Sequence, residues 1–328
     1  MKRNGYTQAE FNSVFTDHKV PMLKQRCTNK LCDGSLVPSI RSIFGTTMHP
    51  DLAKLQCEMG AEHTYRAAQN ILNKKASSVR RVNNHERVHH VVESVGQYIS
   101  DTIISEPTPP VDVTSELILQ VDGGHLKDKN PEQRSFEAMT AVAYRPGSVL
   151  YSIKAKDHRG KILNKHCAAS ALSDDQQYMK AATLIAVKKQ GLDKCTHVSA
   201  LCDGATNCWN IVNSLEPHCA SITRILDWFH IAMKFKNIAI PDDFKEDYSG
   251  AKWSLWHGKP DAAIEKLKAI KQEINGEKTL LKIEKLITYI NNNKDYIVCY
   301  ENRKNKGLTF TSHFAESTVE SLINQRCK

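Results

Sequence analysis

Two apolar segments of this sequence each end in Asp-Gly. Residues 119–124 read LQVDGG, and residues 201–205 read LCDGA. Asp-Gly is common in tight turns, because Gly accepts a positive φ and the Asp side chain bonds to nearby backbone. The alternative is that Asp122 and Asp203 share a metal ion, since carboxylate oxygens are the hard ligands that Mg²⁺ prefers. The elements that carry the two aspartates decide between these interpretations.

The chain from Ser115 onward alternates between strand and helix patterns in an order that would bring the aspartates together. Strands are predicted at 115–122, 137–144, 148–155, 196–203 and 220–228, and helices at 174–191, 205–215 and from 229 onward. A three-strand antiparallel meander followed by parallel strands with crossover helices is the ribonuclease H-like order. The first and fourth strands are neighbours in that order, so Asp122 and Asp203 would face each other. Two such carboxylates repel unless a cation lies between them.

A third carboxylate would complete a pair of metal sites. Residues 307–326 read GLTFTSHFAESTVESLINQR, and Glu316 and Glu320 are one helical turn apart in this segment. Two metal ions about 4 Å apart can activate a water or a 3′-hydroxyl and stabilise the leaving oxygen of a phosphodiester. The carboxylates therefore predict phosphoryl transfer with two Mg²⁺ or Mn²⁺ ions.

The chain of 328 residues is long enough for two or three domains. We predict an α/β protein whose ribonuclease H-like mixed sheet carries an all-α insertion and follows a helical N-terminal domain. The predicted segments are an irregular N-terminal segment at 1–48, a helix-turn-helix-like DNA-binding domain at 49–100, a linker at 101–114, a catalytic core at 115–240, a helical insertion at 241–300 and a C-terminal catalytic helix at 301–328.

Residues 50–100 have the pattern of three helices. Asn83 can cap the last of them, whose inner face carries Val88 and the valines at helical spacing after it. Short helices with basic residues ahead of the final one resemble a helix-turn-helix, in which the last helix enters the major groove. A plain helical bundle with a basic rim is the alternative. The candidate DNA-binding residues are Lys74, Lys75, Arg80, Arg81, Arg87 and His90.

Charge and cysteine usage limit the partners and the compartment. The formal charge of +9 is compatible with a polyanion, although lysine-rich surfaces are often only solvated. No apolar stretch approaches the length of about 20 residues that spans a membrane, so no membrane association is expected. The cysteines are scattered, several of them inside apolar segments, and they favour buried thiols in a reducing cytoplasm over a disulfide framework. Cys27 and Cys32 form at most half of a degenerate zinc knuckle, because a second pair of ligands is missing, and we do not expect zinc.

Four motifs resemble those of the DDE transposases of bacterial insertion sequences, in the Mutator-like group whose catalytic domain is interrupted by a helical insertion. LQVDGG and ALCDGATNCWNIV look like the two aspartate strands, and ILDWFH is similar to the Asp/Cys-x-x-His element that follows them. The closing segment is similar to Gly-Leu-x-x-x-Ser-x-x-x-Glu-Ser with an arginine ten residues after the glutamate, as from Gly307 through Glu316 to Arg326. The resemblance covers about residues 50–328.

The resemblance implies roles for individual residues. Asp122, Asp203 and Glu316 would bind the metal ions. Glu320 is the second candidate for the third ligand, although Arg326 then follows only six residues later. His230 would lie near the scissile phosphate, where it would orient a water, a strand end or a metal ligand. The alternative for His230 is a residue at a helix start that bonds Asp227 and packs in the core.

The implied reaction is hydrolysis at transposon ends, followed by attack of the freed 3′-hydroxyl on target DNA. The implied partners are double-stranded DNA, as terminal inverted repeats and target, and further copies in a homodimer or larger assembly. Such a protein would be found in the bacterial cytoplasm, at the nucleoid when bound to DNA. Related transposases continue further beyond the glutamate, so a truncated, catalytically inactive DNA-binding remnant is one alternative. Another ribonuclease H-like nuclease, such as a junction resolvase, is a second, against which the helical insertion and the Asp-x-x-His element argue.

Overall fold

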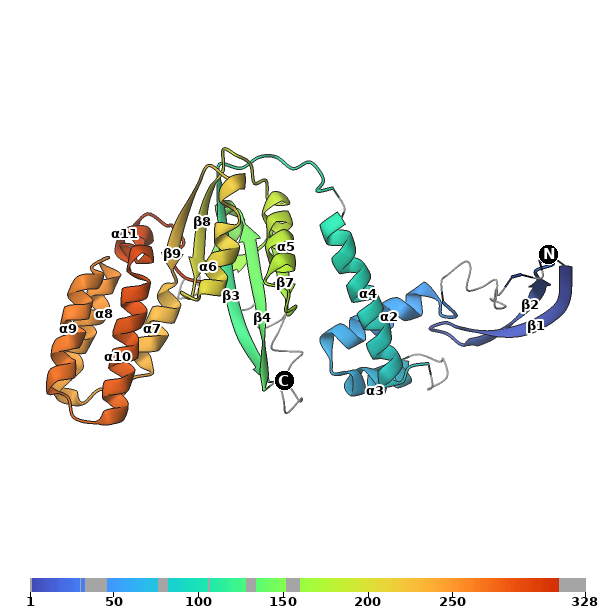
Figure 1. Ribbon diagram of the computed structural model, residues 1–328, viewed down its shortest axis with the longest axis horizontal. Helices are drawn as coiled ribbons and strands as arrows, with labels where there is room; N and C mark the ends of the chain where they lie inside the picture. Colours follow the sequence, from blue (N-terminus) through green and yellow to red (C-terminus); the bar gives the residue numbers. More distant parts are fainter. Residues whose placement is uncertain are drawn as a thin grey trace. The chain divides into compact units, whose positions relative to one another are not determined.

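The computed structural model describes residues 2–29, 31–32, 46–75, 82–105, 107–127, 134–151 and 160–312. Internal contacts divide the chain into two compact units, with the boundary between Ser105 and Glu106. Both units are drawn in Figure 1, and each is described by itself. Within the described ranges, no helix combines the length and the apolar character needed to cross a membrane.

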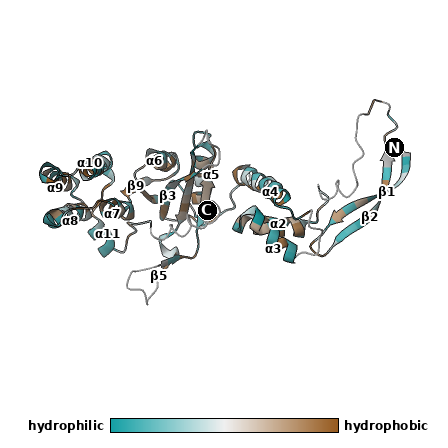
Figure 2. Cartoon of the chain, turned by 90° about the horizontal axis from the view of Figure 1, so that it is seen from below, coloured by the Kyte–Doolittle hydropathy of each residue, from teal (hydrophilic) through white to brown (hydrophobic). Residues whose placement is uncertain are grey.

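The first unit begins with an antiparallel hairpin of β1 (Lys2–Asn12) and β2 (Asp17–Arg26). The prediction of an irregular segment is wrong for these residues. Both strands are mostly hydrophilic (Figure 2), so they lack the apolar alternation that marks a half-buried strand. Pro21 in β2 also lowers the strand signal, because proline cannot donate a ladder hydrogen bond.

Three helices follow the hairpin, as predicted: α2 (Pro50–Glu62), α3 (Tyr65–Lys75) and α4 (His85–Ser105). Their contact is apolar and includes Leu72 and Val88, which are fully buried. The cap of α4 differs from the prediction, since the side chain of Asn84 accepts a hydrogen bond from the Arg87 N–H at 2.7 Å. Asn83 is buried instead and accepts from the Gln56 amide at 2.9 Å. Helix α4 also continues to Ser105, so residues 101–105 of the predicted linker are helical.

The second unit is built on a mixed sheet of five strands within the described residues, in the order β7-β4-β3-β8-β9. The strands are β3 (Glu116–Lys127), β4 (Ser135–Tyr144), β7 (His166–Ser170), β8 (His197–Cys202) and β9 (Ser221–Leu226). Strands β3, β4 and β7 pair antiparallel, whereas β8 is parallel to both β3 and β9. The first and fourth predicted strands are therefore neighbours, as expected.

The third strand of the sheet is not the predicted one. Within the predicted strand at 148–155, only β5 (Val149–Tyr151) is a described strand, and it pairs with β6 (Gly160–Ile162) in a separate two-stranded sheet. Its place beside β4 is taken by β7, whose sequence HCAAS is short and weakly apolar. The prediction failed because the apolar and aromatic residues of 148–155 gave a stronger strand pattern than the small residues that form the strand.

Helices cover both faces of the sheet. Helices α5 (Gln177–Lys188) and α6 (Thr206–Asn213) pack on one face, where Leu117, Leu119 and Val121 of β3 join their apolar cluster. Ile118 belongs to the cluster on the opposite face, with residues of α7 (Trp228–Lys236). Because side chains alternate along a strand, Asp122 points to the same face as Ile118.

The predicted helical insertion is helical in the structure. It comprises α8 (Lys245–Trp256), α9 (Pro260–Glu273) and α10 (Glu277–Asn292), followed by α11 (Tyr300–Asn305). Helices α8, α9 and α10 form a bundle beside the sheet (Figure 1). The apolar cluster of this bundle, which includes Leu267 and Ile290, is continuous with Leu226 at the end of β9. The helical segment is therefore packed directly against the strand ends.

Candidate functional site

Three aspartates lie at the same level across neighbouring strands. Val121 of β3 is paired with Cys202 of β8, and Cys202 is paired with Leu226 of β9. The next residues along these strands are Asp122, Asp203 and Asp227, three of the predicted site residues. Paired strands are about 4.8 Å apart, so the carboxyl edge of the parallel strands carries a row of three carboxylates.

The three carboxylates are close enough for their charges to act on one another. Burial raises the pKa of Asp122, the charge of His230 lowers it, and the charges of Asp203 and Asp227 raise it further. Gly123 donates its N–H to Asp122 Oδ1 at 2.9 Å. The structure therefore brings His230 close enough to Asp122 for its charge to act on that carboxyl. In the described part of the chain, no Lys or Arg forms an ion pair with Asp122 or Asp203.

Asp203 is held by the turn that follows it. The Ala205 N–H donates to Asp203 Oδ1 at 2.8 Å, and Gly204 between them has a φ of 97°. The thiol of Cys208, on α6, is hydrogen-bonded to Asp203. Burial and the charges of Asp203 and Asp122 raise the pKa of this thiol, so it stays protonated. The Asp-Gly turn chemistry is thus present, and it orients the carboxylate without neutralising its charge.

Asp227 has a different environment, with a side chain only 1% exposed. Its Oδ1 accepts from the N–H groups of Phe229 and Ser312, both at 3.0 Å, and its Oδ2 accepts from the Ser312 hydroxyl. His230 Nε2 lies 3.6 Å from Oδ2. Burial raises the pKa of Asp227, while Ser312, His230 and Phe229 lower it. Asp227 therefore caps α7 and anchors two other groups, which leaves it poorly placed to bind a metal.

The last described segment of the chain passes beside this row. The Trp228 N–H donates to the Phe310 carbonyl at 3.3 Å, and the Gln120 amide donates to the Thr311 carbonyl at 3.5 Å. Gln120 and Ser312 were not predicted as site residues, because their contacts join parts of the chain far apart in sequence. The predicted residues Glu316, Glu320 and Arg326 lie outside the described residues.

The donor set at Asp122 and Asp203 suits a hard divalent cation. Both residues supply carboxylate oxygens, their negative charges repel each other, and no Lys or Arg among the described residues forms an ion pair with them, although the charge of His230 acts on Asp122. Mg²⁺ and Mn²⁺ bind such oxygens and commonly retain water ligands. The two aspartates can therefore hold a cation, whereas Asp227 and His230 lie beside it in supporting positions.

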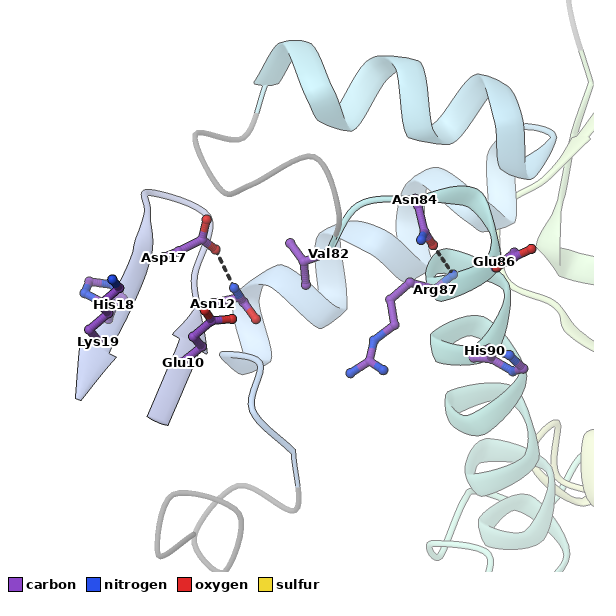
Figure 3. Close-up of a pocket in the computed structure, with 10 residues that line it drawn as sticks. All are labelled: Glu10, Asn12, Asp17, His18, Lys19, Val82, Asn84, Glu86, Arg87 and His90. Carbon is purple, nitrogen blue, oxygen red and sulfur yellow. Dashed lines mark hydrogen bonds between the residues drawn. The ribbon is translucent and has the colours of Figure 1, made fainter. Parts of the chain in front are cut away.

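The predicted DNA-binding residues of the first unit are only partly described. Lys74 and Lys75 are exposed at the end of α3, while Arg80 and Arg81 lie outside the described residues. Arg87 and His90 are exposed on α4 and line a cavity of ≈ 700 Å³ between this helix and the hairpin (Figure 3). Its other lining residues are Glu10, Asn12, Asp17, His18, Lys19, Val82, Asn84 and Glu86.

Two further groups in the first unit could ligate metals. The thiols of Cys27 and Cys32 are exposed, and hydrogen bonds with Asn29 and Cys32 lower the pKa of Cys27. His89, His90 and Glu93 on α4 place candidate ligand atoms within 4.8 Å of one another. Both groups lie at the surface of the first unit, whereas the three aspartates belong to the second unit. No protein-family model and no curated protein sequence matches the chain.

Proposed function

We propose that this chain is a transposase, which cleaves the phosphodiester backbone at the ends of a DNA element and joins the freed 3′-hydroxyl to target DNA. The observation that carries this proposal is the pair of unneutralised carboxylates, Asp122 and Asp203, at one level of adjacent strands. The strand order β7-β4-β3-β8-β9 supports it, because it is the order expected of a ribonuclease H-like domain. The resemblance of the four sequence motifs to DDE transposases supports the particular reaction.

Asp122 and Asp203 would hold Mg²⁺ or Mn²⁺, with Glu316 as the third ligand. When bound, two such ions activate the attacking oxygen and stabilise the leaving oxygen of a phosphodiester. Ser312 lies against Asp227, and Glu316 is four residues further along the chain. Arg326 and Glu320 remain the second candidates in this segment.

His230 would act on the substrate from the side of α7. Its ring lies close enough to Asp122 to lower the pKa of that carboxyl, and Asp227 lies beside its Nε2 atom. A carboxylate in this position orients an imidazole and favours the tautomer whose N–H points at the carboxylate. With the N–H of Nε2 directed at Asp227, Nδ1 of the neutral ring is an acceptor, so His230 can orient an attacking water.

The first unit would recognise the DNA ends. Lys74 and Lys75 at the end of α3 and Arg87 at the start of α4 are exposed cations on neighbouring helices. Cations in this arrangement bind phosphates and fix a helix against a groove. The lysine-rich helical segment α8 to α10 would hold flanking or target DNA, in agreement with the formal charge of +9.

The test is cleavage of a labelled duplex that carries the terminal repeat of the element, with Mg²⁺ or Mn²⁺. The native chain is compared with Asp203→Asn, which keeps the size of the side chain and removes its charge. Cleavage at the repeat boundary that is lost in the variant supports the transposase. A salt titration of binding provides the second readout, in which Arg87→Gln should reduce the slope by about one.

Two other outcomes would contradict the proposal. Equal binding by both proteins without cleavage would identify a DNA-binding protein that is catalytically inactive. Metal-dependent cleavage of branched DNA, with no preference for the repeat, would identify a different nuclease with the same aspartates. The substitution at Asp203 separates the first outcome from the second, because it affects only a protein that cleaves.

A further inference from the structure

The backbone at the ends of β8 and β9, beside Asp203 and Asp227, accepts hydrogen bonds from two tyrosines of the helical segment, which here includes α8 to α11. The Tyr289 hydroxyl, on α10, donates to the Asp203 carbonyl oxygen at 2.7 Å. The Tyr300 hydroxyl, at the start of α11, donates to the Leu226 carbonyl oxygen, also at 2.7 Å. Leu226 is the residue immediately before Asp227. Two hydroxyls from one helical segment thus bind the backbone at two of the three aspartates.

The surroundings of both tyrosines keep them as donors. Tyr300 is completely buried, and a buried hydroxyl without a partner is unfavourable. Burial raises the pKa of Tyr289 and of Tyr300, and the charges of Asp203 and Asp227 raise that of Tyr289 further. Both phenols therefore remain protonated at neutral pH. The ammonium group of Lys234, on α7, lies 4.2 Å from the centre of the Tyr289 ring and covers it.

Helix α10 makes a second contact with the same turn. Asn293 follows α10, is 5% exposed, and donates its amide to the Tyr289 carbonyl at 3.0 Å. A Cβ atom on Gly204 would lie 2.9 Å from Asn293 Oδ1. The glycine therefore lets the side chain of Asn293 lie directly against the turn. Backbone contacts from Tyr289 and close packing from Asn293 fix the turn that orients the Asp203 carboxylate.

We propose that Tyr289 and Tyr300 are positioning residues, through which the helical segment sets the geometry of the row of aspartates. Neither residue needs to touch DNA or metal for this role. A movement of α10 relative to the sheet would move the Asp203 backbone, so binding of DNA to the helical segment and alignment of the carboxylates would be coupled. The catalytic consequence rests on the proposed function, whereas the effect on the turn does not.

The experiment compares Tyr289→Phe and Tyr300→Phe with the control Tyr248→Phe. Each substitution removes one hydroxyl and keeps the ring. Tyr248 is a close match, because its hydroxyl also donates to a backbone carbonyl, that of Phe235, at 2.9 Å. This carbonyl belongs to α7 and not to a strand end. Hydrogen exchange of residues 203–207, titration with Mn²⁺ followed by electron paramagnetic resonance, and cleavage rates are measured on the full chain.

The expected result separates local from global effects. Tyr289→Phe should speed exchange at the Ala205 amide and weaken Mn²⁺ binding by roughly 10-fold, as observed when supporting groups of metal ligands are removed. Tyr300→Phe should speed exchange in residues 227–231 and reduce cleavage with a smaller change in Mn²⁺ affinity. Tyr248→Phe should lower thermal stability by a similar amount and leave exchange at 203–207 and Mn²⁺ binding unchanged.

The failure of this inference can be distinguished from the failure of the proposed function. If exchange at 203–207 is the same in Tyr289→Phe and Tyr248→Phe, the positioning role is wrong, whatever the metal data show. If exchange rises only in Tyr289→Phe but the native chain binds no Mn²⁺, the turn is positioned as inferred and the metal-dependent function is wrong. If exchange rises and Mn²⁺ affinity is unchanged, the coupling of α10 to the carboxylate is refuted.

Discussion

The ends of β8 and β9 carry the same residue type at the same register but in different surroundings. Asp203 receives one backbone hydrogen bond at Oδ1 from its own turn and lies beside Asp122. Asp227 receives hydrogen bonds at both carboxylate oxygens, from the start of α7 and from Ser312. The two residues share a parallel ladder, and Asp227 donates its N–H to the Cys202 carbonyl at 2.8 Å.

This difference shows that the neighbours of a carboxylate, rather than its place on the strand, decide its role. At β9 the hydrogen bonds offset the cost of burying a charge and connect α7 to the segment at 310–312. At β8 the charge is oriented but not neutralised, which is the arrangement that a cation can complete. We therefore propose metal binding for Asp203, whereas Asp227 holds the structure around His230.

The largest expected effect is on cleavage by Asp203→Asn. Loss of a group that merely supports a metal ligand lowers activity by ~10–100-fold, so loss of the ligand itself should exceed about 100-fold. The free energy of unfolding of the metal-free protein should be unchanged or higher, because the substitution removes one of three charges that repel each other. Cleavage assays and chemical denaturation without metal measure the two effects.

A matched control is Asp295→Asn, at an exposed aspartate in the helical segment. Neither cleavage nor stability should change in this variant. A large loss of stability in Asp203→Asn would show that Asp203 resembles Asp227 and would remove the contrast between the two strand ends.

The second effect is a loss of stability in Asp227→Asn. The amide retains Oδ1 as an acceptor, but its NH₂ group cannot accept from the Ser312 hydroxyl or attract the His230 ring. We expect the free energy of unfolding to fall by about 1–3 kcal/mol, the range for leaving a buried group without its partner. Denaturation in the absence of metal measures this loss directly.

A double-mutant cycle with Ser312→Ala isolates the contact. Because Asp227 and Ser312 bond each other, their coupling energy should exceed ~0.5 kcal/mol. Additive effects would mean that Ser312 does not depend on Asp227 and that the chain at 310–312 is held by other contacts, such as that with Gln120.

Much of the fold could be predicted because its elements carry strong periodic patterns. Strands β3, β4, β8 and β9 and the helices between them follow apolar runs or helical spacing in the sequence. The hairpin of β1 and β2 could not be found this way, since its strands are mostly hydrophilic (Figure 2) and Met22 is the buried hydrophobic residue among their described side chains. Strand β7 was missed because five residues, HCAAS, give too short a pattern.

The site was predictable only in the part that depends on local sequence. Asp122 and Asp203 each follow an apolar run and precede glycine in the sequence, so the strand order brings them together, although β3 continues through Asp122 to Lys127. The hydrogen bonds of Tyr289 and Ser312 cross long stretches of chain and depend on how helices dock on the sheet. Neither spacing nor residue type signals such contacts, which is why the different role of Asp227 emerged only from the structure.

A third prediction concerns Gly204, which has no counterpart at the end of β9. Its φ of 97° lies in a region that costs a residue with a side chain about 1–2 kcal/mol, and a Cβ would also press on Asn293. Gly204→Ala should lower the free energy of unfolding by about that amount and weaken Mn²⁺ binding. Gly124→Ala is the control, because a Cβ there meets nothing within 4 Å. Equal stability of the two variants would show that the turn at Asp203 tolerates a side chain.

The smallest effect is on the pH dependence of stability, and it separates Asp122 from an ordinary exposed aspartate. Because its pKa is raised in the folded state, the folded protein binds a proton more tightly than the unfolded chain. The stability of the metal-free protein should therefore fall as pH rises from about 4, the ordinary aspartate value, and level off above the raised pKa.

Asp122→Asn removes this slope, and the difference from the native chain should be near zero at low pH and largest at neutral pH. Asp203, Asp227 and His230 face the same carboxyl, and their charges act on it. Mn²⁺ added at neutral pH should stabilise the native chain and not the variant, because it binds the carboxylate that the variant lacks. A difference in stability that does not vary with pH would mean that Asp122 has the same pKa in the folded and unfolded chain, which would refute the inference that burial opposes its charge.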